Sequence, residues 1–498
     1  MNRRRRSLAR KQHGFVLIAL VALLVMGGLY FFISNLSPEF VQARRQQLTG
    51  EALAQARDAL IGYAVRYRED QINDGQLDRV YGYLPLPDLG SSRNNNVDPK
   101  CNDAGFRLEG CDAASNTAKH TVIGRFPWRT LGTEPLRDGN GECLWYVVSD
   151  SHDRVQRPTP MNWDTLGQLD VVIANDSASL ISALASAHDR PVAIIFSPGP
   201  PLPGQDRSPS SVAPPVGDDV SQCGGNYNPA NYLDPSIASV LGGASVYFPG
   251  SSAVDTSTSS MALAIHGTID KAGSNLHNKC PQGSTCTTVA NDRGLALTND
   301  VLFGALRMSS NFRLDINSML DRMTGCLRDQ IAAGSALVLQ APSATHTEKS
   351  TGRIPDNPCY DNNQDPRGYY DNYKDQAFVA ACTSGACLNV AVDGVSSSCA
   401  GTLLFAGQRS VSQSRADAPQ RNAVSNYLDN DNIGDGALTL TDNNLTSFTT
   451  QGQTTFAGPG QFARISSTHA ANQDIVRCIP SGASMVAAPS ALPPGWAR

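Results

Sequence analysis

The hydrophobic pattern of the chain is strongest near its amino terminus, where one apolar run is free of charge. No charged residue stands from Phe15 to Pro38, and a helix needs about twenty apolar residues to cross a bilayer core. The residues before this run include basic side chains and no acidic one: Arg3, Arg4, Arg5, Arg6, Arg10 and Lys11. Because positive charge stays on the cytoplasmic side, the pattern predicts a transmembrane helix over 15–36 that exports the remaining chain.

A helical pattern continues beyond the apolar run. Ser37, Pro38 and Glu39 resemble a helix start, with a capping hydroxyl, a proline in the first turn and an acid at the positive end of the helix dipole. Apolar side chains then recur at helical spacing, at Leu53, Ala56, Leu60, Tyr63, Ala64 and Tyr67. We expect one helix from Phe15 to Asp70, roughly 84 Å long at about 1.5 Å per residue, whose outer half over 37–70 packs on a head.

The rest of the chain contains an internal repeat. Its first copy comprises Ile194-Ile195-Phe196, Gly199, Gln205-Asp206-Arg207 and Asn231-Tyr232-Leu233-Asp234. Its second copy comprises Leu403-Leu404-Phe405, Gly407, Gln413-Ser414-Arg415 and Asn426-Tyr427-Leu428-Asp429. Upstream, Leu86-Pro87-Asp88 matches Ile354-Pro355-Asp356, and a candidate helix over 315–333 matches the first helix. We expect an α+β fold in which the long transmembrane helix carries two related heads, 71–300 and 301–479. Each head would pack a helix on a mainly antiparallel sheet, and 480–498 would form a loose tail.

Composition agrees with this division. The 498 residues are too many for one ordinary core, and 43 Gly and 30 Pro favour sheet and loop. The formal net charge is -5, and the chain without its basic leader is more acidic still. An acidic chain binds polyanions poorly, so nucleic acid is not an expected partner.

The cysteines indicate export. All 12 lie after the apolar run, and the pairs that are close in sequence are Cys101 and Cys111, Cys280 and Cys286, and Cys382 and Cys387. None has the C-x-x-C spacing of zinc or thioredoxin-like sites. We therefore expect a disulfide framework in an oxidising compartment.

Several motifs together resemble a known family. The basic leader meets the apolar run at Gly14-Phe15, and the predicted helix follows. Later come Leu84-Pro85-Leu86-Pro87-Asp88, Pro127-Trp128-Arg129-Thr130-Leu131-Gly132, a turn at Asp138-Gly139 and Leu144-Trp145-Tyr146-Val147-Val148-Ser149. This order is similar to type IV pilins and type II secretion pseudopilins, especially to large uncharacterised pilin-like proteins. The resemblance implies that prepilin peptidase cuts after Gly14, removes the leader 1–14 and methylates Phe15.

One position departs from the family pattern. Most pilins carry Glu at the fifth mature residue, where this chain has Ala19. In the family, this carboxylate pairs with the N-terminal amine of a neighbouring subunit, and its absence is characteristic of the minor pseudopilin at the tip. The resemblance therefore implies a low-copy subunit.

Other export signals stay open as alternatives. A cleaved signal peptide would end in small residues, whereas this run ends in Tyr30, Phe31, Phe32 and Ile33. A twin-arginine signal could use Arg5-Arg6, and a plain single-span anchor could contain Gly14-Phe15 by coincidence.

The sequence offers little for catalysis or cofactors. It contains no H-E-x-x-H, no G-x-S-x-G and no glycine-rich phosphate loop. One acidic cluster could hold Ca²⁺ through Asp429, Asp431 and Asp435. Ile433 and Leu440 interrupt the EF-hand pattern there, so an Asn/Asp/Gly turn between two strands is the alternative. We expect no enzyme activity and, apart from this candidate calcium, no cofactor.

These observations favour a non-enzymatic minor pilin or pseudopilin at or near the tip of a type IV pilus or type II secretion pseudopilus. It would sit in the bacterial inner membrane, with its amino terminus in the cytoplasm and its heads in the periplasm or on the assembled pilus at the cell surface. Its partners would be other pilins and the prepilin peptidase. The alternative is a membrane-anchored extracellular adhesin or hydrolase with a signal unrelated to pilins.

Overall fold

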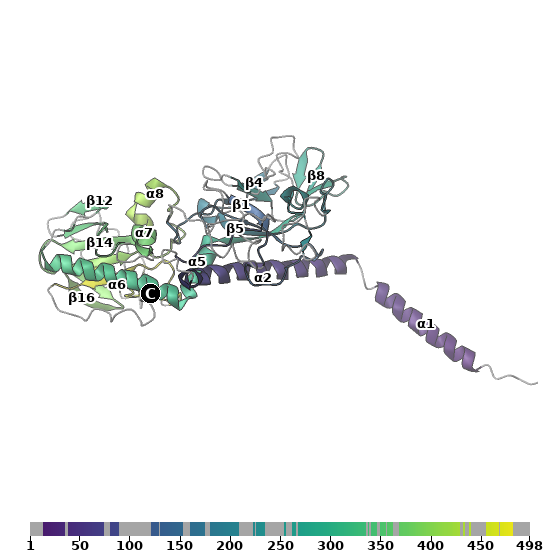
Figure 1. Ribbon diagram of the computed structural model, residues 1–498, viewed down its shortest axis with the longest axis horizontal. Coiled ribbons are helices and arrows are strands. Elements are labelled where there is room, and N and C mark those ends of the chain that lie inside the picture. Colours follow the sequence, from purple (N-terminus) through teal and green to yellow (C-terminus); the bar gives the residue numbers. More distant parts are fainter. Residues whose placement is uncertain are drawn as a thin grey trace, which may run out of the picture.

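The computed structural model describes residues 13–34, 38–73, 80–88, 121–128, 130–152, 160–174, 180–208, 223–224, 226–234, 253–254, 261–264, 267–334, 337, 340–345, 349–354, 356–361, 368–428, 432–433, 438–439, 455–467 and 469–481. Within them the chain is α+β, with sheets built mainly from antiparallel pairs. Figure 1 shows an elongated molecule in which two sheet-containing heads lie end to end along helices.

The amino-terminal helix differs from the expectation. Helical residues fall into two helices, α1 (His13–Ser34) and α2 (Pro38–Asn73), and Figure 1 shows α1 leaving the line of α2. Proline fixes φ and lacks an N–H, so Pro38 suits the first turn of a new helix.

Among the residues that the structure describes, no helix is both long enough and apolar enough to span a bilayer. The predicted continuous transmembrane pilin helix from Phe15 to Asp70 is therefore wrong, because the helical residues are divided between α1 and α2 and neither helix qualifies as a span.

The first head is built on a five-stranded antiparallel sheet, in the order β11-β5-β2-β1-β6. These strands are β1 (Thr121–Arg125), β2 (Trp145–Val148), β5 (Pro191–Ser197), β6 (Ala253–Val254) and β11 (Arg293–Thr298). A smaller sheet contains β4 (Leu180–Ser182), β3 (Leu169–Ala174) and β7 (Met261–Ala264), with β3 and β7 parallel. A third sheet contains β10 (Thr287–Ala290), β8 (Ile269–Ala272) and β9 (Asn275–His277), and two 3₁₀ turns are η3 (Ala187–Asp189) and η4 (Pro229–Asn231).

The second head follows α5 (Asn299–Met308) and α6 (Ser310–Ala332). Its main sheet has the order β12-β13-β14-β17-β21, formed by β12 (Gln340–Thr345), β13 (Lys349–Arg353), β14 (Ala377–Cys382), β17 (Gly401–Phe405) and β21 (Ile475–Ile479). The smaller sheet contains β16 (Val395–Cys399), β15 (Leu388–Val392) and β20 (Thr455–Gly458), with β15 and β20 parallel. The remaining elements are α7 (Tyr369–Tyr373), η5 (Lys374–Gln376), α8 (Ala418–Asn422), η6 (Val424–Asn426) and the pair β18 (Asn432–Ile433) and β19 (Leu438–Thr439).

The two main sheets share the order of four strands and differ in the fifth: the edge strand beside β1 is β6, which comes later in the chain, whereas the edge strand beside β13 is β12, which comes just before it. In the first head β1 pairs with β2, β2 with β5 and β5 with β11. In the second head β13 pairs with β14, β14 with β17 and β17 with β21. Each head also has a hairpin whose first strand lies parallel to a strand from much later in the chain. The likeness therefore extends beyond the short segments that repeat in the sequence.

The strand register corrects one match between the repeats. Arg125 lies opposite Trp145, and Arg353 lies opposite Phe378. The equivalent of Ile354-Pro355 is therefore Phe126-Pro127, each following an arginine at the end of a strand. The match of Ile354-Pro355-Asp356 to Leu86-Pro87-Asp88 is wrong, because Asp88 pairs with Arg125 across an isolated antiparallel bridge and does not follow it in the strand.

One core runs through both heads. The buried face of α2 consists of Leu53, Ala56, Leu60, Ala64 and Tyr67, and that of α6 includes Ile316, Leu320, Met323 and Leu327. Both faces belong to one cluster of buried apolar residues. The opposite face of each main sheet is covered separately, around Trp145 in the first head and Phe378 in the second.

Candidate functional site

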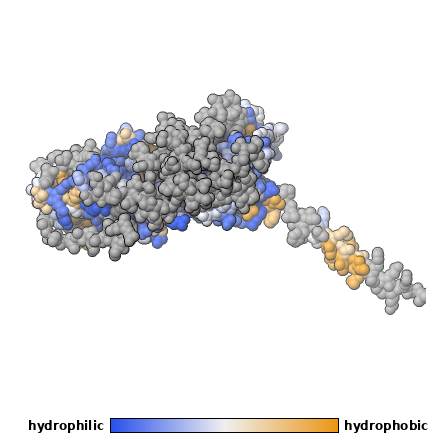
Figure 2. All heavy atoms as spheres, viewed as in Figure 1, coloured by the Kyte–Doolittle hydropathy of each residue, from blue (hydrophilic) through white to orange (hydrophobic). Residues whose placement is uncertain are grey.

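The exposed side of α1 is the first candidate for function. Gly14 and Phe15 lie near the start of this helix, and Ala19 is exposed on it. Eight large apolar side chains are 52% to 70% exposed: Leu17, Ile18, Leu20, Val21, Leu23, Leu24, Val25 and Met26. Figure 2 shows them as a hydrophobic patch apart from the heads. A contiguous group of eight exposed apolar side chains is typical of a surface that contacts another molecule.

The expected disulfide framework is confirmed. Five disulfides are present, Cys143–Cys223, Cys280–Cys286, Cys326–Cys359, Cys382–Cys387 and Cys399–Cys478, and no cysteine of the described residues is free. The pair Cys101 and Cys111 lies outside these residues. Three of the bonds join cysteines far apart in sequence, which spacing alone did not identify. This framework is typical of proteins that fold in an oxidising compartment outside the cytoplasm.

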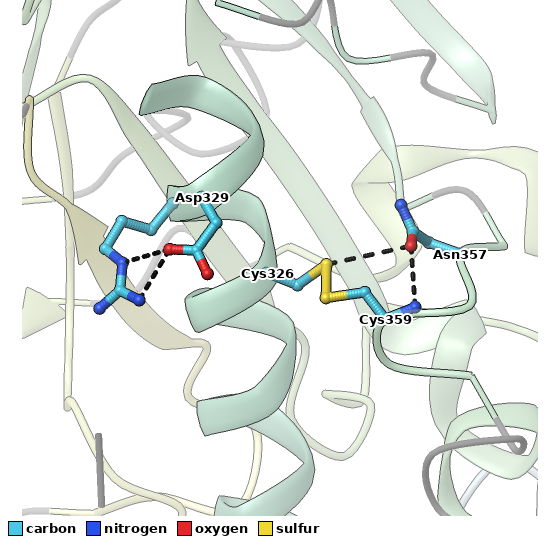
Figure 3. Close-up of a disulfide and its surroundings, with 5 residues drawn as sticks. Cys326, Asp329, Asn357 and Cys359 are labelled. Carbon is cyan, nitrogen blue, oxygen red and sulfur yellow. Dashed lines mark hydrogen bonds and ion pairs between the residues drawn. A yellow bond between two sulfur atoms is a disulfide. The ribbon is translucent and has the colours of Figure 1, made fainter. Parts of the chain in front are cut away.

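One of these bonds fastens a helix to a loop. Figure 3 shows Cys326 on α6 joined to Cys359, beside Asn357. The Asn357 Oδ1 accepts a hydrogen bond from the Cys359 backbone N–H at 2.9 Å and lies 3.9 Å from the Cys326 sulfur. The loop after β13 is thereby held on the helix that supports the second sheet.

The candidate calcium ligands Asp429, Asp431 and Asp435 lie outside the described residues. Within the described part of the chain, no group of three or more His, Cys, Asp or Glu side chains is placed to hold a metal ion.

Two histidines are buried at positions where they accept or share hydrogen bonds. His152 lies between the Ser151 hydroxyl, 2.8 Å from Nδ1, and the Asn299 side chain, 3.0 Å from Nε2. Burial lowers the pKa of His152, and also that of His188, to about 4. Both imidazoles are therefore neutral near pH 7. Their surroundings indicate a role in packing.

The repeated segments build the same cluster in each head, a tyrosine contacted by two arginines. In the first head Arg125 and Arg207 lie over the Tyr232 ring, 4.8 Å and 5.0 Å from its centroid. In the second head Arg353 and Arg415 lie over Tyr427 at 4.6 Å and 4.4 Å. We call each one an Arg–Tyr–Arg cluster. Cation–π attraction is strong in such buried surroundings because water does not screen it.

The Gln-x-Arg segments tie two loops together. Arg207 donates to the backbone carbonyls of Gly199, at 2.7 Å, and of Asn231, at 3.1 Å. Arg415 donates in the same way to the carbonyls of Gly407 and Asn426.

The glutamine of each segment repeats its contacts too. Gln205 donates to the carbonyl of Leu233 and accepts from the N–H of Leu202, at 3.1 Å and 2.9 Å. Gln413 makes the matching bonds to the carbonyl of Leu428 and the N–H of Ser410, at 3.4 Å and 2.9 Å. The sequence repeat thus encodes a hydrogen-bond network that satisfies loop backbone groups.

The two clusters differ in the carboxylate that neutralises the arginine. Arg207 pairs with Glu142 at 3.2 Å, and the glutamate side chain is 30% exposed. Arg415 pairs with Asp164 at 3.0 Å, and these side chains are 0% and 7% exposed. Since Asp164 precedes β3 of the first head, this buried pair joins one head to the other.

Aromatic and polar groups complete this junction between the heads. The Trp163 ring stacks on Phe462 with 5.7 Å between centroids and lies 5.0 Å from Tyr373. The Asn372 side chain accepts from the N–H of Met161 at 2.6 Å. The heads are therefore joined through buried contacts.

A pair of carboxylates is buried in the first head. Asp234 is 3% exposed and Asp292 is 1% exposed. The Asp234 Oδ2 accepts from the N–H groups of Asn291 and Asp292, both at 2.8 Å, and the Asp292 Oδ2 accepts from the N–H of Asp234 at 2.9 Å. The Oδ1 atom of each carboxylate is buried without a hydrogen-bond partner.

Burial raises the pKa of Asp234 to about 7. Burial and the nearby charge of Asp234 raise the pKa of Asp292 well above its ordinary value. At neutral pH the pair therefore retains a proton, which relieves the repulsion between two buried charges.

Sequence reasoning found part of this arrangement and missed part. The Gln-x-Arg and Asn-Tyr-Leu segments are visible in the sequence as a repeat, whereas their contact with Arg125 and Arg353 is seen only in the structure. A signal was present in Gly124-Arg125-Phe126-Pro127 and Gly352-Arg353-Ile354-Pro355, which share glycine, arginine and proline at equal spacing.

Comparison with known proteins gives no relative. No family model matches the chain, no curated protein matches it, and no solved structure matches it.

Proposed function

We propose that this chain is a low-copy, non-enzymatic subunit of a type IV pilus or type II secretion pseudopilus, located at or near the tip. The observation that supports the proposal most directly is α1, a helix of 22 residues that begins beside Gly14-Phe15 and exposes its described apolar side chains. Such a helix suits packing against equivalent helices of neighbouring subunits. Ala19 would leave it without the carboxylate that links subunits along a shaft.

The division of α2 into two parts agrees with this role. Phe40, Val41 and Leu48 in its first part are 61%, 39% and 38% exposed, whereas Leu60 and Ala64 further on are fully buried. The first turns of the helix therefore carry apolar side chains that the head leaves exposed, whereas from Thr49, which accepts a hydrogen bond from the N–H of Gly139, the helix packs against the head that lies along it in Figure 1. An extended helix could reach neighbouring subunits while the head stays outside the helical core.

The size of the head region favours an end position. Two heads joined by a common core form a bulky body, which would crowd its neighbours if every subunit of a filament carried it. At a tip, this body could face cargo, a surface or a partner pilin. We propose that the heads lie in the periplasm or on the assembled filament, where disulfides persist.

Processing of the amino terminus tests the proposal. We expect mass spectrometry of the protein from its native host to find a methylated Phe15 as the first residue, and an uncut chain in a strain without prepilin peptidase. The substitution Gly14→Val should block cutting, because a bulky side chain hinders approach to the backbone, whereas Gly27→Ala should leave cutting unchanged. An intact Met1 in the native host, or a cut beyond Ile33, would contradict the family assignment.

Immunogold labelling of sheared filaments tests the position. We expect any label to lie at the ends of the filaments and none to lie along the shaft. Label spaced along the shaft in amounts comparable to the major pilin would contradict a tip role.

A further inference from the structure

The guanidinium of Arg125 is buried in the first head without a full set of acceptors. Arg125 is 2% exposed and lies over Trp145, Tyr227 and Tyr232, with 5.4 Å, 5.1 Å and 4.8 Å to the ring centroids. Its Nη2 donates to the carbonyl of Asn226 at 2.7 Å. Its Nε and Nη1 are buried with no hydrogen-bond partner. A buried donor without an acceptor is costly, so something should occupy this position.

The second head provides an internal comparison. Arg353 holds the equivalent strand position and donates through Nη2 to the carbonyl of Arg421, as Arg125 does to that of Asn226. The Nη1 of Arg353 also donates to the carbonyl of Asp375. The first head therefore keeps one of these two contacts and lacks the other.

The first head adds another donor beside the same arginine. Trp145 stands where the second head has Phe378. Its indole Nε1 is buried with no hydrogen-bond partner, and its ring contacts the Arg125 guanidinium. Three buried nitrogen donors, two of Arg125 and one of Trp145, thus lack an acceptor.

A cavity of about 10 Å³ lies against Arg125, which is room for one water-sized group. Its wall includes Trp128, the Cys143–Cys223 disulfide and Tyr227. Asp88 also lines it, and the Asp88 Oδ2 accepts a hydrogen bond from the Tyr227 hydroxyl at 3.4 Å. Asp88 and Arg125 pair through their backbones, at 2.9 Å and 2.8 Å, and the Asp88 carboxylate does not occupy the unpartnered donors of Arg125.

We propose that this cavity binds one small anionic acceptor at Arg125. A chloride ion or one carboxylate oxygen could accept hydrogen bonds from Nε and Nη1, the two unpartnered nitrogens of Arg125, which lines the cavity. The carboxylate could belong to an acidic side chain of a partner protein. Charge-assisted hydrogen bonds to an anion are stronger than those to water.

Chloride binding to the full-length chain tests the site. In chloride titrations followed by ³⁵Cl NMR, we expect a saturable line broadening that is absent from Arg125→Gln. The matched control is Arg353→Gln, which should keep the broadening because that arginine is occupied by backbone carbonyls. Acetate that displaces chloride would identify a site open to carboxylates, and acetate that does not would identify a halide site.

A second variant guards against loss of folding in Arg125→Gln. Arg125→Lys keeps the positive charge and removes the unpartnered Nε and Nη1 donors. We expect chloride to bind at least about fivefold more weakly to it, the effect of losing one hydrogen bond. A wild-type chain without saturable broadening would mean that the cavity holds only water, and the proposal would fail. It would also fail if Arg125→Gln and Arg125→Lys, both folded, bound chloride as the wild type does.

Discussion

Replacing Asp292 by Asn should make the first head more stable at alkaline pH. Asp234 and Asp292 place two carboxyl groups in one buried site, where each Oδ2 accepts backbone N–H groups and each Oδ1 has no hydrogen-bond partner. Asparagine has nearly the same shape. Its carbonyl can accept the Asp234 N–H, and its amide carries no charge at any pH, so the substitution removes the repulsion between the two side chains.

The direction of the effect follows from the raised pKa values. The pKa of Asp234 rises from 3.8 to about 7 in the folded chain, chiefly through burial. Between about pH 4 and pH 7 the folded state therefore binds more protons than the unfolded state, and stability falls as pH rises through this window. Below it, the contribution to stability is fully present.

The magnitude follows from the same shift. One pKa unit corresponds to about 1.4 kcal/mol, so a change of this size makes the wild type roughly 4 kcal/mol less stable at pH 8 than at pH 3. In Asp292→Asn, Asp234 stays buried and keeps its own desolvation cost. The variant removes the second raised pKa, that of Asp292, so we expect it to lose part of the decline in stability between pH 4 and pH 8 and to keep the part that belongs to Asp234.

Urea unfolding of the full-length chain from pH 4 to pH 8.5 tests this expectation. Amide exchange at Asp234, Asn291 and Asp292 measures the local effect. Asp206→Asn is the matched control. Asp206 is exposed on the same head and bonded to Ser208, which lowers its pKa, so its loss should not flatten the slope between pH 4 and 7. The reasoning is refuted if Asp292→Asn keeps the wild-type slope, or if it destabilises the head equally at every pH.

Two further predictions use contrasts within the chain. Asp164→Asn should lower the free energy of urea unfolding by about 3–5 kcal/mol, because it leaves the fully buried Arg415 without a counter-charge. Glu142→Gln should lower it by less than about 1 kcal/mol, because its pair with Arg207 is partly exposed. Equal losses would contradict a role for Asp164 in joining the heads. Replacing Cys326 and Cys359 by Ser should lower the stability by roughly 3–4 kcal/mol, and replacing Cys382 and Cys387 by Ser should lower it by roughly 2 kcal/mol, because the first bond spans 33 residues and the second spans 5. Thermal unfolding in matched buffers measures both losses. A larger loss for the short loop would contradict the loop-entropy argument.

Local patterns in the sequence predicted several features well. The apolar spacing of Leu53, Ala56, Leu60 and Ala64 identified the buried face of α2, because one side of a helix recurs every three or four residues. The even number of cysteines, together with the predicted export of the chain, predicted the disulfides. The repeat of Gln-x-Arg and Asn-Tyr-Leu identified segments that make the same bonds twice.

The same kind of pattern gave a wrong prediction where the result depended on whether the amino-terminal helix is continuous. An apolar run followed by a helical pattern predicts one continuous membrane-spanning helix, yet the structure has two helices, and no helix among the described residues could cross a bilayer. The run of charge-free residues alone could not determine how far a single helix extends.

What the sequence by itself determined, then, is local: helix faces, strand-rich heads, cysteines that form disulfides and the segments that repeat. Only the tertiary structure decided which distant groups meet. Asp164 and Arg415 are 251 residues apart, Cys143 and Cys223 are 80 apart, and Arg125 reaches Tyr232 from a different strand and loop. The reason is physical: periodicity and turn chemistry act between near neighbours, whereas a buried ion pair or ring contact depends on how whole sheets and helices pack, and no short window of sequence records that packing.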